Sequence, residues 1–271
     1  MSDRIWTVYL SGEIHSDWRE RIATGIAEAG LPVELTGPVT VHEDSDDCGV
    51  AVFGGEGNDI ARGGDGNDFV RGDEGNDQLF GDAGDDGLSG GDGKDTLHGG
   101  EGNDFLAGGA GADTLFGNAG DDTLLGGTGG DTLDGGAGND QLQGEGGTDV
   151  FIGGAGIDFM IGAGGSDRFI FDLGAAQQES GIGLGNSDTI ADFNADNTSS
   201  AHDTIEFQGV VEFTFVGDEN QAFSGTGASG RFNDSTKVLE SDADGDLVTD
   251  LEIELQNVDG SQLDDTDFTV S

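Results

Sequence analysis

The 271-residue sequence contains very few of the residues that form covalent cross-links or carry positive charge. Cys48 is its only cysteine, which excludes a disulfide within the chain. Lysine and arginine together number 9 against 56 aspartates and glutamates, so the formal net charge is −47. A charge of this sign argues against nucleic acid and anionic lipid as partners, and it favours small multivalent cations as counter-charge.

Long apolar runs are also missing. The segment from Ile5 to Leu10 is too short for the core of a signal peptide, and no stretch is long enough to span a bilayer. We therefore expect no transmembrane segment, and export would have to use a signal other than a conventional N-terminal one. The combination of 54 glycines with a large acidic excess is by itself typical of a disordered tail. Periodicity has to decide between disorder and a repeat fold.

What the sequence does have is a strict repeat. Residues 54–170 divide without insertion or deletion into thirteen units of nine residues, of which the first reads GGEGNDIAR and the second GGDGNDFVR. The eighth position is apolar in every unit, from Ala61 to Phe169. The sixth position is aspartate in every unit: Asp59, Asp68, Asp77, Asp86, Asp95, Asp104, Asp113, Asp122, Asp131, Asp140, Asp149, Asp158 and Asp167.

The unit predicts a short strand joined to a sharp turn. Glycines at the first, second and fourth positions allow the backbone to turn tightly, and the last three residues suit a short strand whose central apolar side chain points inward. Two turns and two strands complete one coil of eighteen residues, so each unit stacks on the unit two places earlier. We therefore predict a mainly β protein built on a parallel β-roll, a form of β-solenoid, over residues 54–170.

The repeated aspartate predicts calcium as the cofactor. Ca²⁺ prefers six to eight hard oxygen ligands, and one turn offers too few, so each site is expected between stacked turns that supply the aspartate and backbone carbonyls. All thirteen position-six aspartates are candidate metal ligands, and they would form about eleven interior sites. Departures from the usual unit should weaken their sites; they are Lys94, Glu145, Ile157 and Ala163. At cytosolic calcium levels the chain should be unfolded, and it should fold outside the cell.

The period stops after residue 170, and the rest of the chain has a different pattern. Short alternating segments such as SDTIADF, HDTIEF and LEIEL predict a C-terminal antiparallel β cap over residues 171–271. Three apolar triplets, at 150–152, 159–161 and 169–171, mark the strands of the last three units, so we expect the cap to cover them. The stretch DADGD is either half of a calcium loop or a plain acidic hairpin turn, and this choice stays open for Asp242, Asp244, Asp246 and Asp250.

The nonapeptide resembles the repeat of RTX exoproteins, whose repeats are of the hemolysin type and bind calcium. The segment SDTIADF at 187–193 and the ending DDTDFTV at 264–270 resemble the C-terminal domain of the same family. This resemblance implies a secreted, extracellular protein that type I secretion machinery exports by reading an uncleaved C-terminal signal. It would also explain the lack of a conventional N-terminal signal.

Residues 1–53 have an ordinary composition and predict a small βαβ-like unit. The segments WTVYLSGEIHSDWRE and TGPVTVHEDSDDCGVAVFG resemble the start of the YtoQ-type family, which is similar to nucleoside 2-deoxyribosyltransferases. The likeness ends where the repeats begin, so most of that domain would be absent. About fifty residues bury too little to enclose a substrate. We therefore expect a cap or a remnant without a catalytic site, although a complete domain could use Glu13, His15, Asp17, His42 and Glu43.

Three classes of function fit these patterns. The first is a secreted, non-enzymatic calcium-binding protein with a structural or adhesive role, whose ligand would be an extracellular surface or a polysaccharide. The second is a secreted enzyme, in which a nucleoside-directed N-terminal unit is carried by the RTX export module. The third is adhesion through exposed Phe69, Phe105 and Phe159, although these residues are several coils apart. The chain has no HExxH motif, which argues against a zinc protease. We predict the first class.

Overall fold

The computed structural model describes residues 49, 51–172, 187–195, 202–208, 213–218, 228–233, 238–242, 251–256, 258, 263–264 and 267–270. Of the predicted βαβ-like unit at 1–53, only residues 49 and 51–53 are described, and Ala51–Phe53 begin the first strand of the roll. Its candidate residues from Glu13 to Glu43 lie outside the described residues. Within the described ranges, no helix has the length and apolarity needed to cross a membrane.

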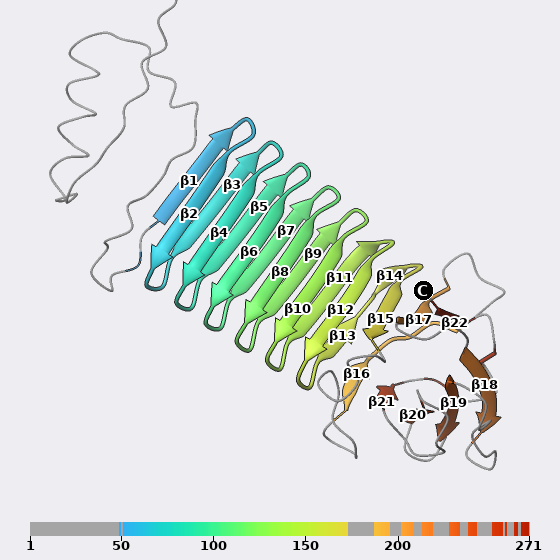
Figure 1. The fold of residues 1–271 in the computed structure, drawn as a ribbon. Helices are drawn as coiled ribbons and strands as arrows, with labels where there is room; N and C mark the ends of the chain where they lie inside the picture. The colour runs from blue at the N-terminus through green and yellow to red at the C-terminus, as the bar shows by residue number, and fades with distance from the viewer. Residues whose placement is uncertain are drawn as a thin grey trace, which may run out of the picture.

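The repeats form the predicted parallel β-roll (Figure 1). Consecutive strands lie in opposite sheets, and Ala51 of one coil pairs with Phe69 of the next, eighteen residues later. One sheet contains β1 (Ala51–Glu56), β3 (Phe69–Glu74), β5 (Gly87–Asp92), β7 (Phe105–Ala110), β9 (Thr123–Thr128), β11 (Gln141–Gly147) and β13 (Phe159–Ile161), and the short β14 (Gly164–Gly165) pairs with β11. The other contains β2 (Ile60–Asp65), β4 (Gln78–Ala83), β6 (Thr96–Glu101), β8 (Thr114–Ala119), β10 (Thr132–Ala137), β12 (Val150–Ala155) and β15 (Arg168–Asp172).

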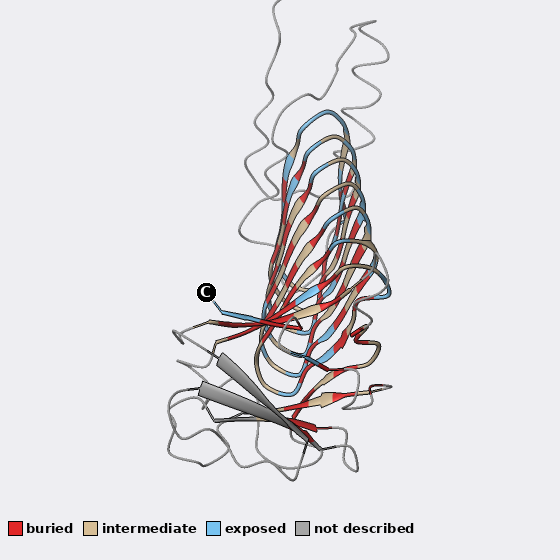
Figure 2. Ribbon diagram, turned by 90° about the vertical axis from the view of Figure 1, so that its right-hand side faces the viewer, coloured by how far each residue is buried: buried red, intermediate tan, exposed pale blue. Residues whose placement is uncertain are grey.

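The core of the roll is a single column of side chains between the two sheets. Every position-eight residue from Ala61 to Phe169 is at most 1% exposed, which confirms the predicted inward face. The neighbouring strand residues are half-buried or exposed, and Figure 2 shows this alternation along the coils. Because each strand contributes one core side chain, the apolar burial per coil is small, about two side chains of about 1.5–3 kcal/mol each.

The second position of the unit requires a backbone with positive φ. The structure has this conformation even in units whose second residue is not glycine. Gly91 has a φ of 118°, Glu145 has a φ of 69° and Ala163 has a φ of 64°. A non-glycine residue in this region is strained, and the strain is greater for alanine than for Asn or Asp. The units that begin at Gly144 and Gly162 therefore retain the turn but carry backbone strain.

Two segments after the repeats extend the roll. β16 (Asp188–Ile190) pairs in parallel with β13, and β17 (Thr204–Gln208) pairs in parallel with β15. β22 (Phe268–Val270) then pairs in parallel with β17. The prediction of an antiparallel cap is wrong for these three strands. Asp-Thr-Ile forms β16 and occurs again at 203–205, where β17 begins. It repeats the sixth to eighth positions of the unit, so β16 and β17 stack as further coils.

The pairing of the remaining strands agrees better with the predicted antiparallel hairpins. β20 (Val238–Asp242) lies antiparallel to both β19 (Ala228–Asn233) and β21 (Leu251–Leu255), which confirms the expected hairpin around DADGD. β18 (Phe213–Asp218) pairs in parallel with β19, and β21 pairs in parallel with β16. These strands therefore continue one sheet of the roll. Asp242 ends β20, but Asp244, Asp246 and Asp250 lie outside the described residues, so the alternatives for this turn stay open.

The expected covering of the last units is found only in part. Ile170 and Phe171 are buried, at 9% and 2% exposure, but Phe159 remains 37% exposed. The prediction is therefore wrong for Phe159. Its partner in β16 is Thr189, and β16 continues the sheet in its own plane instead of folding over it.

The single-column core predicts a large difference between two adjacent leucines. Leu124 is 0% exposed between the sheets, whereas Leu125 is half-buried on the outer face. We expect Leu124→Ala to lower the free energy of unfolding in saturating calcium by about 2–5 kcal/mol. The matched variant Leu125→Ala should cost clearly less. Denaturant unfolding of both variants checks this, and equal losses would contradict a core confined to position eight.

Candidate metal centres

The position-six aspartates form two rows, one along each edge of the roll, where the chain passes from one sheet to the other. Neighbours in a row are eighteen residues apart, for example Asp95, Asp113 and Asp131. Although aspartate is normally a surface residue, those from Asp68 to Asp167 are at most 5% exposed. The sequence thus predicted which residues converge, and the roll places all thirteen in equivalent turns.

One oxygen of each carboxylate holds the next coil in place. The backbone N–H of Asp113 donates to Oδ1 of Asp131 at 2.8 Å, and the same bond recurs along both rows. Beyond the last unit, Asp158 donates to Asp188 and Asp167 donates to Asp203, each at 2.8 Å. The rows therefore continue past the repeats. The sequence analysis missed these two aspartates, although the Asp-Thr-Ile pattern could have revealed them.

The second oxygen of most of these carboxylates is buried without a hydrogen-bond partner. This holds in the described structure for Oδ2 of Asp59, Asp77, Asp86, Asp95, Asp104, Asp113, Asp122, Asp131, Asp140, Asp149 and Asp158. A buried carboxylate oxygen without a donor costs free energy, and native structures normally satisfy it. A row of such atoms has the character of a set of cation ligands.

A backbone oxygen faces the same space as nine of these carboxylates, those of Asp59 and of Asp77 to Asp140. A Cβ placed on Gly108 would lie 2.6 Å from Oδ2 of Asp113 and 2.7 Å from the carbonyl oxygen of Gly126, one coil further on. The same arrangement surrounds Gly126, at 2.7 Å from Asp131 Oδ2 and 3.0 Å from the Gly144 carbonyl. The first glycine of the unit thus leaves a space lined by two oxygens, and any side chain would fill it.

This donor set fits calcium and few other metals. Within the described ranges, no three His, Cys, Asp or Glu side chains are grouped closely enough to hold a metal ion. Side chains alone therefore do not make these sites, and backbone carbonyls have to supply further oxygens. An all-oxygen set of carboxylates and carbonyls is typical of Ca²⁺, whereas zinc prefers nitrogen and sulfur.

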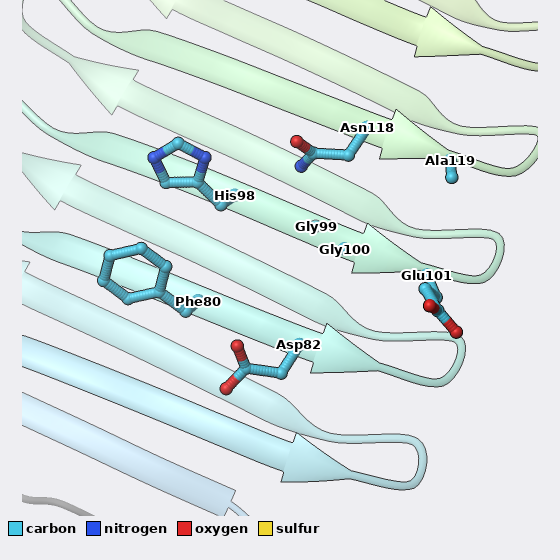
Figure 3. Close-up of a pocket in the computed structure, with 8 residues that line it drawn as sticks. All are labelled: Phe80, Asp82, His98, Gly99, Gly100, Glu101, Asn118 and Ala119. Atoms are coloured by element: carbon cyan, nitrogen blue, oxygen red, sulfur yellow. The ribbon is translucent and has the colours of Figure 1, made fainter.

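A separate feature lies on the outer face of β4, β6 and β8. The rings of Phe80, His98 and Phe116 stack along the roll with centroids 5.1 and 4.7 Å apart, and the Arg62 guanidinium lies 3.9 Å above the Phe80 ring. Beside this stack is an open hollow of about 380 Å³ (Figure 3). It forms because Gly100 has no side chain between Asp82 and Asn118, the equivalent residues one coil away on either side. The hollow offers a contact surface away from the aspartate rows.

Comparison with known families identifies the repeats. The model of the RTX calcium-binding nonapeptide repeat matches residues 53–88, 89–124, 125–160 and 144–175. Residues 53–175 are RTX calcium-binding repeats. This result agrees with the geometry of the aspartate rows, and it supports Ca²⁺ as the cofactor of this segment of the chain.

The N-terminal segment matches a different family. The model named nucleoside 2-deoxyribosyltransferase YtoQ matches residues 9–69. The uncharacterized protein YtoQ of Bacillus subtilis (strain 168) is 40% identical over 55 residues, which are 20% of this chain and 37% of that protein. The chain therefore spans little more than a third of the length of this relative.

Two solved structures are similar to the chain as well. One is the solution structure of the AlgE6R3 subunit from the Azotobacter vinelandii mannuronan C5-epimerase, with a TM-score of 0.39 and 28% identity, over 55% of this chain and 78% of that one. The other is the crystal structure of the extracellular lipase LipA from Serratia marcescens, with a TM-score of 0.28 and 18% identity, over 82% and 40% respectively.

The aspartates of the RTX roll have strongly perturbed acidities. Burial raises the pKa of Asp86, Asp122 and Asp140 to about 7 from the ordinary 3.8. The N–H bond to each carboxylate lowers its pKa, but neighbouring aspartates of the same row raise it further. Burial likewise raises the pKa of Asp113 and Asp149 to about 6. A cation between the coils would oppose these shifts, since it favours the ionised form of each carboxylate.

These raised pKa values predict that protons stabilise the roll when calcium is absent. The folded pKa values exceed the ordinary value of 3.8, so between about pH 4 and 7 the metal-free roll binds more protons than the unfolded chain, and its stability falls as the pH rises. In EGTA we therefore expect more β structure at about pH 4.5 than at about pH 8, measured by circular dichroism. No gain of β structure on acidification would argue against the raised pKa values.

Proposed function

We propose that this chain is a secreted calcium-binding protein whose RTX roll folds when it meets Ca²⁺ outside the cell. The rows of buried Oδ2 atoms without donors support this proposal most directly, because most of these atoms face a carbonyl oxygen, and such a pair of oxygens needs positive charge between them. The net charge of −47 also supports the proposal, because repulsion between the carboxylates opposes compaction of the chain until bound cations reduce that charge. All thirteen position-six aspartates are the proposed ligands.

The energy available from calcium is large enough to drive folding. A site with a dissociation constant in the extracellular range of about 10⁻⁴ to 10⁻³ M contributes roughly 1.4 kcal/mol when free calcium is about ten times that value. About eleven sites together would then give on the order of 15 kcal/mol, comparable with the stability of a whole domain. At cytosolic calcium the same contribution is close to zero.

We expect circular dichroism to show little β structure in EGTA and a cooperative gain of β structure in millimolar Ca²⁺. Equal concentrations of Mg²⁺ should have a much smaller effect, since Mg²⁺ demands octahedral geometry and retains its water. The full chain should be used for this measurement. Identical spectra in EGTA and in millimolar Ca²⁺ would contradict the proposal.

Two adjacent aspartates provide a matched test of the ligand assignment. Asp122 is 1% exposed in its row, whereas Asp121 is exposed at the fifth position of the same turn. Asp122→Asn keeps an acceptor for the N–H of Asp104 but removes the charge, so it should raise the calcium midpoint of folding several-fold and lower the stoichiometry. Asp121→Asn removes the same charge nearby and should change the midpoint little. Equal shifts would mean that only net charge matters.

For the extracellular role we propose non-enzymatic structural or adhesive work, after export by type I secretion machinery. Phe53, Phe69 and Phe105 are 57%, 47% and 47% exposed, and the Phe53 and Phe69 rings lie 6.2 Å apart. Together with the hollow beside His98, they give the roll apolar and aromatic contact surfaces for a cell surface or a polysaccharide. Calcium-dependent binding to such a ligand that Phe69→Ala weakens would support adhesion, and full binding in EGTA would argue against it.

The second candidate is a secreted enzyme in which the N-terminal segment acts on nucleosides. Only the YtoQ match at residues 9–69 favours it, and the chain covers 37% of that relative. Turnover of deoxynucleosides by the purified full chain would establish this candidate in place of the non-enzymatic role.

A further inference from the structure

The turns at the two edges of the roll share two hydrogen bonds and differ in a third. At both edges, the N–H of the fourth position donates to a carbonyl one coil further on, as Gly102 does to Ala119 and Gly111 does to Thr128. The N–H of the sixth position donates to the aspartate one coil further on, again at both edges. Only the N–H of the fifth position depends on the sequence, because its acceptor is the side chain at the fifth position one coil earlier.

One edge has an uninterrupted series of these acceptors, and we call it the Asx edge. Asp85 donates to Asn67, Asn103 to Asp85, Asp121 to Asn103, Asn139 to Asp121 and Ile157 to Asn139, at 2.8–3.1 Å. Every acceptor in this series is an Asn or Asp Oδ1. The four turns from Asp85 to Asn139 therefore have three successive N–H groups fixed by neighbouring coils.

The opposite edge loses the series part-way, and we call it the gapped edge. Asn76 donates to Asn58 and Lys94 donates to Asn76, at 2.9 and 2.8 Å. The next residues at the fifth position are Lys94, Ala112 and Gly130, and none of these side chains has an acceptor. The N–H groups of Ala112, Gly130 and Thr148 therefore have no side-chain acceptor in the coil before them.

The difference does not come from the aspartates themselves. Asp104 and Asp122 on the Asx edge are 3% and 1% exposed, and Asp113 and Asp131 on the gapped edge are 2% and 1% exposed. Their Oδ2 atoms are buried in the same way. The two edges thus offer calcium the same carboxylates, held in turns that are fixed to different degrees.

We propose that the calcium sites of the Asx edge bind more tightly than the sites at Asp113, Asp131 and Asp149 of the gapped edge. The Asn and Asp residues at the fifth position act as positioning residues, because they fix the turn whose carbonyls and carboxylate surround the ion. Because the chain folds as it binds calcium, a further hydrogen bond that stabilises the folded turn raises the apparent affinity of its site. This inference rests on the proposed function, and it divides the calcium sites of the roll into two classes.

The two edges can be followed separately by residue-resolved hydrogen exchange of the full chain at a series of free calcium concentrations. As calcium is withdrawn, the amides of Asp113, Asp131 and Asp149, which donate to the next aspartate of the gapped edge, should lose protection first. Those of Asp104, Asp122 and Asp140, which make the same bond on the Asx edge, should remain protected down to free calcium about fivefold lower, the effect of about one net hydrogen bond. Loss of protection at one common concentration on both edges would overturn the inference.

Two designed variants test whether the acceptors at the fifth position cause the difference between the edges. Lys94→Asn with Ala112→Asn supplies acceptors for the N–H groups of Ala112 and Gly130, and should move the gapped-edge transition about fivefold towards that of the Asx edge. Lys94→Met removes the same charge without adding an acceptor, and should move it much less. An equal shift in both proteins would assign the effect to charge and overturn the positioning role. Protection that is independent of calcium on both edges would refute the proposed function itself, and the inference with it.

Discussion

The structure depends on what lies between the buried carboxylates and the carbonyl oxygens that face them. Each coil brings another pair of oxygens to the same kind of space, as around Gly108, and nothing in the described chain supplies the positive charge that would make this arrangement favourable. The apolar column cannot supply the missing energy alone, because each strand contributes a single side chain to it. The RTX roll is therefore a fold in which an ion replaces part of the core that larger domains build from apolar side chains.

The two oxygens of each position-six aspartate have separate tasks. Oδ1 of Asp131 accepts the N–H of Asp113 and so fixes the spacing of two coils, while Oδ2 remains directed at the space beside Gly126. Asparagine could do the first task, but it would lack the charge for the second. One residue type thus links backbone order to ion binding in every turn, and this explains why the sixth position tolerates no other residue across thirteen units.

The repeat made most of the roll predictable, because a fixed period determines both the stacking and the inward face. The column from Ala61 to Phe169 and the two rows of aspartates followed from position in the unit alone. Prediction failed where the period was broken by insertions. Asp188 and Asp203 continue the rows after 30 and 36 residues instead of 18, so counting in nines could not find them. The exposure of Phe159 was missed for a related reason, since it depends on the path of β16.

The alternation of strands between two sheets also constrains how such a chain can change in length. β16 joins the sheet of β13, and β17 joins the sheet of β15. Inserting one nonapeptide would exchange the two sheets for everything downstream, and would bring β16 to the side on which β17 now pairs. Inserting two would lengthen the roll by about 4.8 Å, one strand spacing, and leave both ends correctly joined. Gene duplication within this segment should therefore be tolerated in steps of eighteen residues, so homologues should differ by whole coils.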